Sequence, residues 1–186
     1  MIACAHGHIR TAEPDDAPAL RRVYDYRAPR AAVLDIRREP YAPVTDELRE
    51  LLSQRDTGQN AFFAIEDATG AVCGFCALRG IKHDAGFAEL SLMFIEDAAL
   101  DTPLAAEALD FAADRAFRGL GLRKLVTHCL EDEGALRAFL TARGFSSDGV
   151  QRDAFFGGGR WHGLESLTLY APAMGNSKNA HDSEHP

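Results

Sequence analysis

The sequence lacks the features that would place the protein in a membrane, on nucleic acid or in the secretory route. None of its apolar runs approaches the roughly 18 residues that a membrane-spanning helix needs. Its 28 acidic residues outnumber 20 basic ones, and the net charge of −8 opposes the basic face that nucleic-acid binding requires. The first ten residues contain no lysine-flanked apolar core of a secretory signal. We therefore expect a cytoplasmic protein with neither membrane nor nucleic acid as a partner.

Cysteine is scarce, and its spacing does not favour a metal site. The four cysteines include one CxxC pair, Cys73 and Cys76, which falls on an expected strand. Residues three apart on a strand point to opposite faces, so the two sulfurs would not converge. No second CxxC is present, and the Cys4–His8 segment falls in an expected frayed terminus. The sequence predicts no metal site and buried, apolar roles for the CxxC cysteines.

The elements that the sequence does predict are alternating strands and helices. A chain of 186 residues has the size of one domain. Apolar or alternating runs predict strands at 8–12, 61–65, 71–78, 87–95, 124–130, 150–156 and 161–170. Capping signals and helical spacing predict helices after 13–16 and at 45–52, 103–119 and 133–142. Residues 28–43 have a mixed pattern and predict irregular structure with a short helix.

This order of elements indicates an α+β fold class. We expect a mostly antiparallel sheet of about seven strands with helices on both faces, and one parallel pair between 87–95 and 124–130. The domain should occupy residues 8–172, between a flexible N-terminus of residues 1–7 and a disordered tail of residues 173–186. Within the central strand, alternation places Glu89, Ser91, Met93 and Ile95 on the face opposite Leu90, Leu92 and Phe94.

Four short motifs, at these intervals, resemble those of a known family. They are Ala88-Glu89-Leu90, Glu107-Ala108-Leu109, the segment from Ala135-Leu136-Arg137 to Arg143-Gly144-Phe145, and the hairpin Gly159-Arg160-Trp161-His162-Gly163. Over residues 8–172 the chain resembles the GNAT acyltransferases, of the type that includes the ribosomal-protein alanine N-acetyltransferases. The resemblance implies transfer of an acetyl group from acetyl-CoA to an amine, either a small molecule or a protein N-terminus.

The resemblance also implies roles for residues of the central strand. Glu89 stands where relatives often carry a glutamate that acts, through water, as base for the attacking amine. A solvated strand residue is the other interpretation of Glu89. The backbone of Met93, Phe94 and Ile95 would align the thioester arm of acetyl-CoA.

In that family a glycine-rich loop after the central strand binds the pyrophosphate of CoA, and here the loop contains no glycine. The basic position falls on Leu100, and the three glycine positions fall on Asp101, Pro103 and Ala105. Pro103 has no N–H to donate, Asp101 brings a negative charge, and Ala105 adds a Cβ. The residues that the resemblance assigns to cofactor binding are Leu100, Asp101, Thr102, Pro103, Leu104 and Ala105.

The same loop predicts a helix start that caps itself. Asp101 or Thr102 would be the N-cap and Pro103 the first helical residue, so that a side-chain oxygen satisfies the amides that a phosphate satisfies in relatives. The family's asparagine and its tyrosine, the acid for the departing thiolate, align with Glu133 and Leu140. Neither residue can play the family's role.

Two functions therefore stay open at this point. One is an acetyl-CoA-dependent N-acetyltransferase, in which Tyr24 and Glu131 are candidate substrate-binding residues and the acidic charge suits a cationic amine. The ordinary interpretations are core packing for Tyr24 and helix capping for the acids 131–133. The other function is a catalytically degenerate member that has lost CoA binding and works as a binding or regulatory module. We expect such a module to form a homodimer through its last strands.

Overall fold

The computed structural model describes residues 2–25, 43–53 and 58–172. They form one eight-stranded sheet in the order β1-β2-β3-β4-β5-β6-β8-β7. The strands are β1 (Ile2–Ala3), β2 (Gly7–Thr11), β3 (Ala61–Asp67), β4 (Val72–Lys82), β5 (Phe87–Phe94), β6 (Lys124–Leu130), β7 (Ser146–Gly157) and β8 (Arg160–Tyr170). Neighbouring strands are antiparallel, except that β5 and β6 are parallel. The predicted α+β class and its parallel pair are confirmed.

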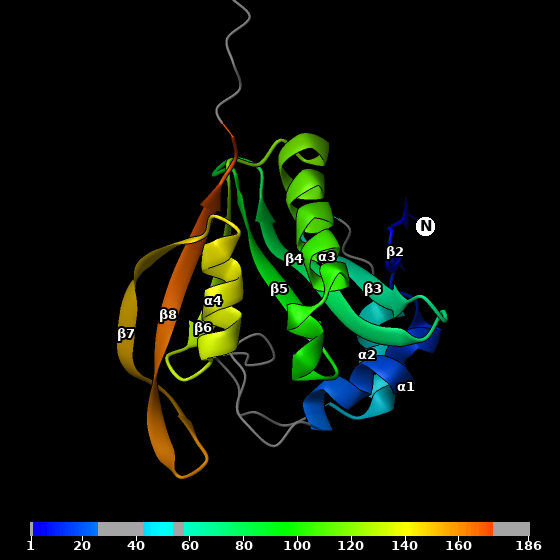
Figure 1. Ribbon diagram of the computed structural model, residues 1–186, viewed down its shortest axis with the longest axis horizontal. Coiled ribbons are helices and arrows are strands. Elements are labelled where there is room, and N and C mark those ends of the chain that lie inside the picture. The colour runs from blue at the N-terminus through cyan, green and yellow to red at the C-terminus, as the bar shows by residue number, and fades with distance from the viewer. Residues whose placement is uncertain (1, 26–42, 54–57, 173–186) are drawn as a thin grey trace, which may run out of the picture.

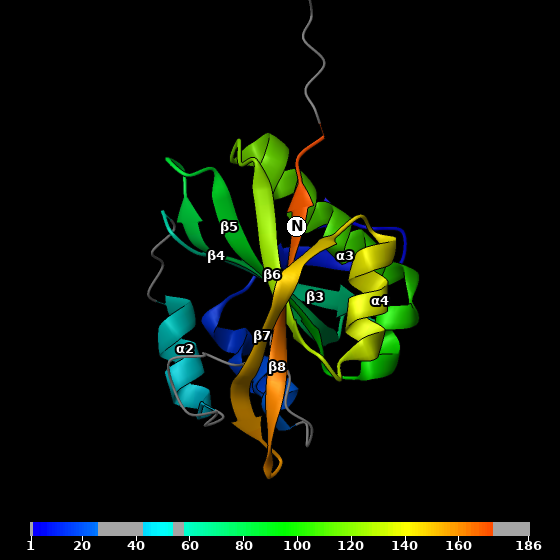
Figure 2. The same cartoon turned by 90° about the vertical axis from the view of Figure 1, so that its left-hand side faces the viewer.

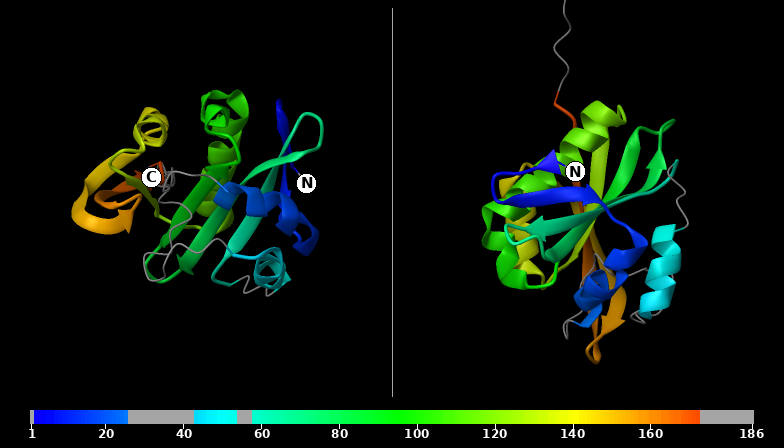
Figure 3. Two further views of the ribbon diagram at one scale, coloured as in Figure 1. Left: turned by 90° about the horizontal axis from the view of Figure 1, so that it is seen from below. Right: turned by 90° about the vertical axis from the view of Figure 1, so that its right-hand side faces the viewer.

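Helices cover both faces of the sheet (Figures 1, 2 and 3). One face carries α3 (Pro103–Asp114), continued by the π-helical turn η5 (Arg115–Gly119), and α4 (Gly134–Ala142). The opposite face carries α1 (Ala17–Leu20), flanked by the 3-10 helices η1 (Pro14–Asp16) and η2 (Arg21–Asp25), and α2 (Thr45–Ser53). A further 3-10 helix, η4 (Asp97–Asp101), leads into α3. No helix in the described ranges is long and apolar enough to span a bilayer.

The sheet separates two apolar cores, and this fixes which side chains of β5 face which helices. The larger core lies against α3 and α4 and contains, from β5, Ala88, Leu90, Leu92 and Phe94. The smaller core lies against α1 and α2. Because successive strand residues alternate between faces, Glu89, Ser91 and Met93 lie on the side of α1, as the sequence predicted.

Element boundaries follow the prediction most closely where the sequence pattern is strongest. β6 has its predicted bounds, whereas β7 begins at Ser146 instead of residue 150 because pairing with β8 continues past the apolar run. β1 lies inside the segment 1–7 that was expected to precede the domain, and it pairs with β2. The expectations for the segment 28–43 and for the tail 173–186 fall almost wholly outside the described residues.

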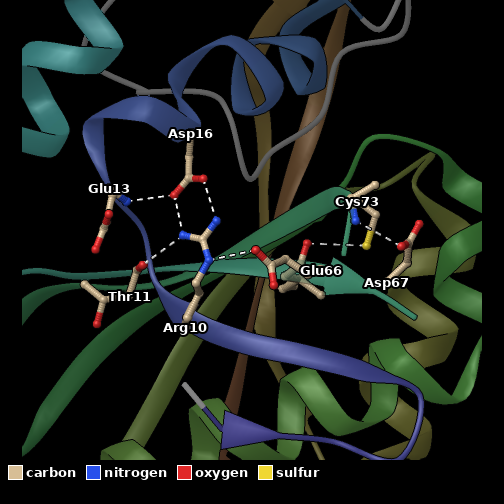
Figure 4. A network of polar contacts seen from close by, with 9 residues as sticks. Arg10, Thr11, Glu13, Asp16, Glu66, Asp67 and Cys73 are labelled. Atoms are coloured by element: carbon tan, nitrogen blue, oxygen red, sulfur yellow. Dashed lines mark hydrogen bonds and ion pairs between the residues drawn. The ribbon is translucent and has the colours of Figure 1, made fainter. Parts of the chain in front are cut away.

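An ion-pair network fixes α1 against the sheet (Figure 4). The guanidinium of Arg10 on β2 donates to both carboxylate oxygens of Asp16, each at 2.7 Å, and to Oε1 of Glu66 on β3 at 2.7 Å. The backbone N–H of Glu13 also donates to Asp16. Burial raises the pKa of the Asp16 carboxyl, but the hydrogen bonds from Arg10 and Glu13 outweigh it, so the net pKa is lowered. The start of α1 is thereby tied to two strands.

The cysteines lie apart from any metal-binding arrangement. Cys76 is fully buried, and burial raises the pKa of its thiol to about 12. Cys73 is half-buried beside a bulge in the β3–β4 pairing, and its Sγ contacts the carbonyl of Ile65 at 3.5 Å. All four cysteines are free thiols. Within the described ranges, no three His, Cys, Asp or Glu side chains gather closely enough to hold a metal ion.

Candidate active site

The parallel strands β5 and β6 lie side by side at their amino ends and then diverge (Figure 1). Their Cα pairs run from Phe87 with Lys124 to Glu89 with Val126. Beyond this point β5 stays paired with β4 as far as Phe94, and β6 stays paired with β8. The facing edges of β5 and β6 are therefore left without a strand partner over the rest of both strands. Such an edge offers backbone N–H and C=O groups to an extended ligand.

The direction of the backbone groups decides which β5 residues serve this open edge. The N–H of Ile95 donates to the carbonyl of Cys73 on β4 at 2.9 Å, and the carbonyl of Met93 crowds Gly74 on the same strand. In an antiparallel pair alternate residues turn their backbone groups the same way. Met93 and Ile95 are thus directed toward β4, and of the three predicted cofactor-aligning residues Phe94 alone faces the open edge. Leu90 and Leu92 share its direction.

Glu89 lies at the point where the two strands part. It is the last β5 residue paired with β6, and its Oε1 accepts a hydrogen bond from Arg79 Nη2 on β4 at 2.5 Å. The Glu89 side chain is 41% exposed, so an incoming substrate can reach it. The role of Glu89 as catalytic base stays a prediction.

Tyr24 lies on the same side of the sheet as Glu89. It is half-buried and packs against the smaller core, as does Phe75 of β4. Burial raises the pKa of the Tyr24 phenol, and the charges of Arg79 and Arg21 oppose that rise. Tyr24 and Glu89 share the α1 side of the sheet, and the part of Tyr24 in substrate binding stays a prediction.

Glu131 is not part of this group. It follows β6 and lies five residues beyond Val126, the partner of Glu89, which is roughly 16 Å at about 3.3 Å per strand residue. A Cβ on Gly163 of β8 would lie 2.8 Å from Glu131 Oε2, so glycine there leaves room for the carboxylate. Glu131 is exposed, and its part in substrate binding stays a prediction.

The two acids after Glu131 have structural contacts. Asp132 Oδ2 accepts from Arg160 Nη2 at 2.5 Å and lies 3.2 Å from His162 Nδ1. Glu133 Oε2 accepts from the backbone N–H of Leu130 at 2.7 Å, which closes the turn into α4. Glu133 is the N-cap residue of α4 but makes no side-chain cap hydrogen bond, so these contacts do not confirm capping as the interpretation of this acidic run.

The loop between β5 and α3 forms the 3-10 helix η4, and half of its predicted cofactor residues face inward. Leu104 and Ala105 are 7% and 0% exposed, in the larger core, and Leu100 packs half-buried against the same core. Asp101, Thr102 and Pro103 are exposed. Apolar burial of Leu100 anchors the loop where relatives carry a basic or amide side chain.

The prediction that a side-chain oxygen caps the start of α3 is wrong, although the predicted N-cap and first helical residue are confirmed. Thr102 is the N-cap and Pro103 the first helical residue, but no side chain makes a cap hydrogen bond. The Thr102 hydroxyl instead donates to the carbonyl of Ala99 at 2.6 Å, because the preceding 3-10 turn presents that acceptor to it. Side chains therefore leave the amide end of α3 uncapped, although Pro103 has no N–H and the N–H of Ala105 already donates to the carbonyl of Thr102 at 3.2 Å.

The helix α4 supplies no acid to the open edge. Leu140, at the position of the family's tyrosine, is 1% exposed in the larger core. Sequence reasoning also missed two residues beside Glu89. Arg79 was missed because the expected strand stopped at residue 78, whereas β4 continues to Lys82. Ser91 was placed on the correct face, but it was given no role.

Comparison with known proteins agrees with this fold. A family model described as "Acetyltransferase (GNAT) domain" matches residues 9–163. The structure of spermidine N-acetyltransferase from Vibrio cholerae in complex with CoA and spermine is similar, with a TM-score of 0.75 and 22% identity over 90% of this chain and 96% of that chain. A dodecameric structure of that enzyme in an intermediate state has a TM-score of 0.74 and 21% identity over 90% and 95% of the two chains. No curated protein sequence matches significantly.

Proposed function

Because the chain belongs to the GNAT acetyltransferase domain family, we propose that it transfers an acetyl group from acetyl-CoA to an amine. The observation that carries the proposal is the divergence of β5 and β6 at Glu89. The backbone groups of Leu90, Leu92 and Phe94 line the open edge and suit the amide groups of the pantetheine arm. Glu89 lies beside the end of that edge, where the thioester would be held.

The chemistry follows from these positions. The amine nitrogen attacks the thioester carbon, so that a C–N bond forms and the C–S bond breaks. Glu89 takes the proton that the amine loses. CoA leaves as the thiolate and takes its proton from solvent, since Leu140 cannot donate one. Holding both substrates against one strand edge supplies the orientation that such a two-substrate reaction needs.

The phosphates of acetyl-CoA would lie at the start of α3. The uncapped amide end of the helix favours an anion there. The negative charge of Asp101 opposes anion binding, and Pro103 lacks a backbone N–H that could donate to a phosphate. We therefore propose that acetyl-CoA binds, but more weakly than in relatives with a glycine-rich loop.

The acceptor is proposed to be a small cationic amine. The net charge of −8, the half-exposed Glu89 and the exposed Glu131 suit such a substrate. The similar Vibrio cholerae enzyme was solved with spermine, which makes polyamines the first acceptors to test. A peptide with N-terminal alanine represents the ribosomal-protein type, which the comparisons do not single out.

Two measurements test this function. Acetyl-CoA at millimolar concentration should raise the Tm by several degrees, since a ligand at about 100 times its Kd stabilises by about 2.7 kcal/mol. Release of the CoA thiol should then depend on spermidine, spermine or another amine. A Tm that does not change with acetyl-CoA would refute the proposal.

That refutation would favour a module that has kept the fold and lost CoA binding. The half-buried Leu100, packed against the larger core, and the charge of Asp101 are the observations on its side. It predicts no thiol release with any amine, together with a stable homodimer by sedimentation velocity.

A further inference from the structure

The charges beside Glu89 are opposite in sign to the net charge of −8 of the whole chain. On the α1 side of the sheet, the next row of side chains toward the amino ends of β5 and β6 runs across four strands. Its members are Cα partners: Lys82 on β4, Phe87 on β5, Lys124 on β6 and Tyr170 on β8. Paired strand residues share a face, and so do residues two apart on one strand. Two ammonium groups therefore flank Phe87, in a row about 7 Å from Glu89 along the strands.

Neither of these ammonium groups has a carboxylate partner. Glu89 is already paired with Arg79, whose Nη2 donates to it at 2.5 Å. No carboxylate in the described ranges forms an ion pair with Lys82 or Lys124. Asp148, which follows the start of β7, is bonded to a threonine hydroxyl of β8 at 2.5 Å. Two positive charges are thus left without a counter-charge beside the proposed base.

The row of Lys82, Phe87, Lys124 and Tyr170 is accessible to an anionic group. The Lys124 ammonium lies over the Phe87 ring, 5.7 Å from its centroid, a distance at which cation and ring attract each other. Phe87 and Lys124 are half-buried, and Lys82 and Tyr170 are exposed, so a ligand can reach the row. A lysine ammonium carries three donors on a flexible stem, which suits a carboxylate that lies between the two lysines.

We propose that Lys82 and Lys124 bind a carboxylate of the acceptor, and that the acceptor is an amino acid whose amine nitrogen lies a few bonds from that carboxylate. With the carboxylate between the two lysines, the amine lies one row further, at Glu89. A second ammonium group in place of the carboxylate is repelled by both lysines. The two cations also favour the neutral form of the amine, which is the form that attacks the thioester. The inference rests on the proposed function, and it replaces polyamines by amino acids as the preferred acceptors.

Acceptors of equal length test the inference on the parent protein. The compounds 4-aminobutyrate, 4-aminobutanamide and 1,4-diaminobutane share the amine and the chain, and they end in an anionic, a neutral and a cationic group. Glycine and glycinamide repeat the comparison at a shorter spacing. For at least one length we expect kcat/KM for the carboxylate to exceed that of its partners by about tenfold or more, since hydrogen bonds between charged groups are worth a factor of this size. No preference for the carboxylate at either length overturns the inference.

Removal of either lysine charge should abolish this preference. In Lys82→Gln and Lys124→Gln we expect the KM for the preferred carboxylate to rise about tenfold, while kcat/KM for its amide changes less than about twofold. Lys82 is exposed, so its variant should fold like the parent. Lys124→Glu should reverse the order and favour the diamine. An unchanged KM for the carboxylate in both glutamine variants shows that it binds elsewhere and overturns the inference.

Arg118→Gln is the matched control because it removes the same charge elsewhere. Arg118 lies on η5, on the opposite side of the sheet, and its side chain is 86% exposed. We expect its KM for the carboxylate to equal that of the parent, and a rise as large as in Lys124→Gln would reflect net charge alone and overturn the inference. A parent that is inactive with every amine refutes the proposed function and this inference with it. Activity that shows no preference for a carboxylate refutes this inference only.

Discussion

At the scale of single residues, Glu89 and Glu131 differ in what surrounds them. Glu89 accepts a hydrogen bond from Arg79 at 2.5 Å and lies where β5 and β6 part. Glu131 is exposed, and its carboxylate lies over Gly163, away from that point. We infer that Glu89 acts on the proton and that Glu131 can affect only the attraction of a cationic amine.

Glu89→Gln should lower kcat by about 10²-fold or more, because glutamine keeps the shape and the contact with Arg79 but cannot take a proton. The Kd of acetyl-CoA from calorimetry should not change. Glu131→Gln is the matched control, and we expect it to raise the KM for a cationic amine while kcat changes less than about twofold. Comparable kcat values for Glu89→Gln and the parent would remove Glu89 as the base.

Asp16 gives a pH-dependent prediction about stability. Its folded-state pKa is lowered, so its contribution is present above the unfolded pKa of about 3.9 and is lost as the pH falls through the folded pKa. Asp16→Asn should therefore cost about 1–3 kcal/mol of unfolding free energy at pH 7 and much less near pH 3, as measured by urea unfolding. Asp15→Asn, an exposed neighbour, should cost little at either pH. An equal loss at both pH values would exclude the ion pair with Arg10 as the cause.

At the scale of elements, the start of α3 combines features for and against an anion. Its amide end has no side-chain cap, while η4 holds Leu100 in the core and leaves Asp101 exposed at the helix start. A helix start acts as an anion site through its free N–H groups, so the charge at residue 101 is the simplest feature to change. Binding of a pyrophosphate by this loop thus depends on the charge at residue 101 as well as on the missing glycines.

Asp101→Asn should tighten acetyl-CoA binding by roughly fivefold at low salt, since removing a like charge near the phosphates gains on the order of 1 kcal/mol. The gain should shrink in 0.5 M NaCl because exposed charges are screened. Asp110→Asn removes the same charge further along α3, where the side chain is 76% exposed, and should leave the Kd unchanged. Equal affinities for the parent and Asp101→Asn in a titration would show that this charge does not limit binding.

At the scale of the whole molecule, the hairpin β7–β8 forms one edge of the sheet (Figure 2). Its pairing register shifts twice, and Asp153 on β7 has a left-handed φ of 48°. Such irregularities hinder the addition of another strand to an edge. The tip is different, because Phe156 and Trp161 stack edge to face at 5.4 Å while 54% and 58% exposed.

A homodimer through the last strands, if formed, should therefore use the aromatic tip of the hairpin. For the module without CoA binding, we expect sedimentation velocity to show a dimer for the parent and a shift toward monomer for Trp161→Ala. Tyr170→Ala removes a side chain of similar exposure, 61%, at the other end of β8 and should not change the assembly. A parent that sediments as a monomer would refute the expected dimer.

Much of the fold could be predicted because its signals are local. Helix starts at Pro14 and Pro103, the turn after Asp67, and the alternation along β5 each depend on a few neighbouring residues. The site was harder to predict, since Arg79 reaches Glu89 only because of the register between β4 and β5. The sequence pattern also could not show that the Thr102 hydroxyl would turn back to Ala99. A hydroxyl can bond either way, and only the conformation of η4 selects the partner.

The sequence by itself determined the order of the elements, the faces of β5 and the absence of glycine from the loop before α3, because each depends on residue type and spacing alone. The tertiary structure decided that β5 and β6 diverge beyond Glu89, that α3 begins without a side-chain cap and that Ser91 and Arg79 each bury an unpaired atom beside Glu89. These features depend on which strands stay paired and on where buried polar atoms find partners. Both are properties of contacts between segments distant in the chain.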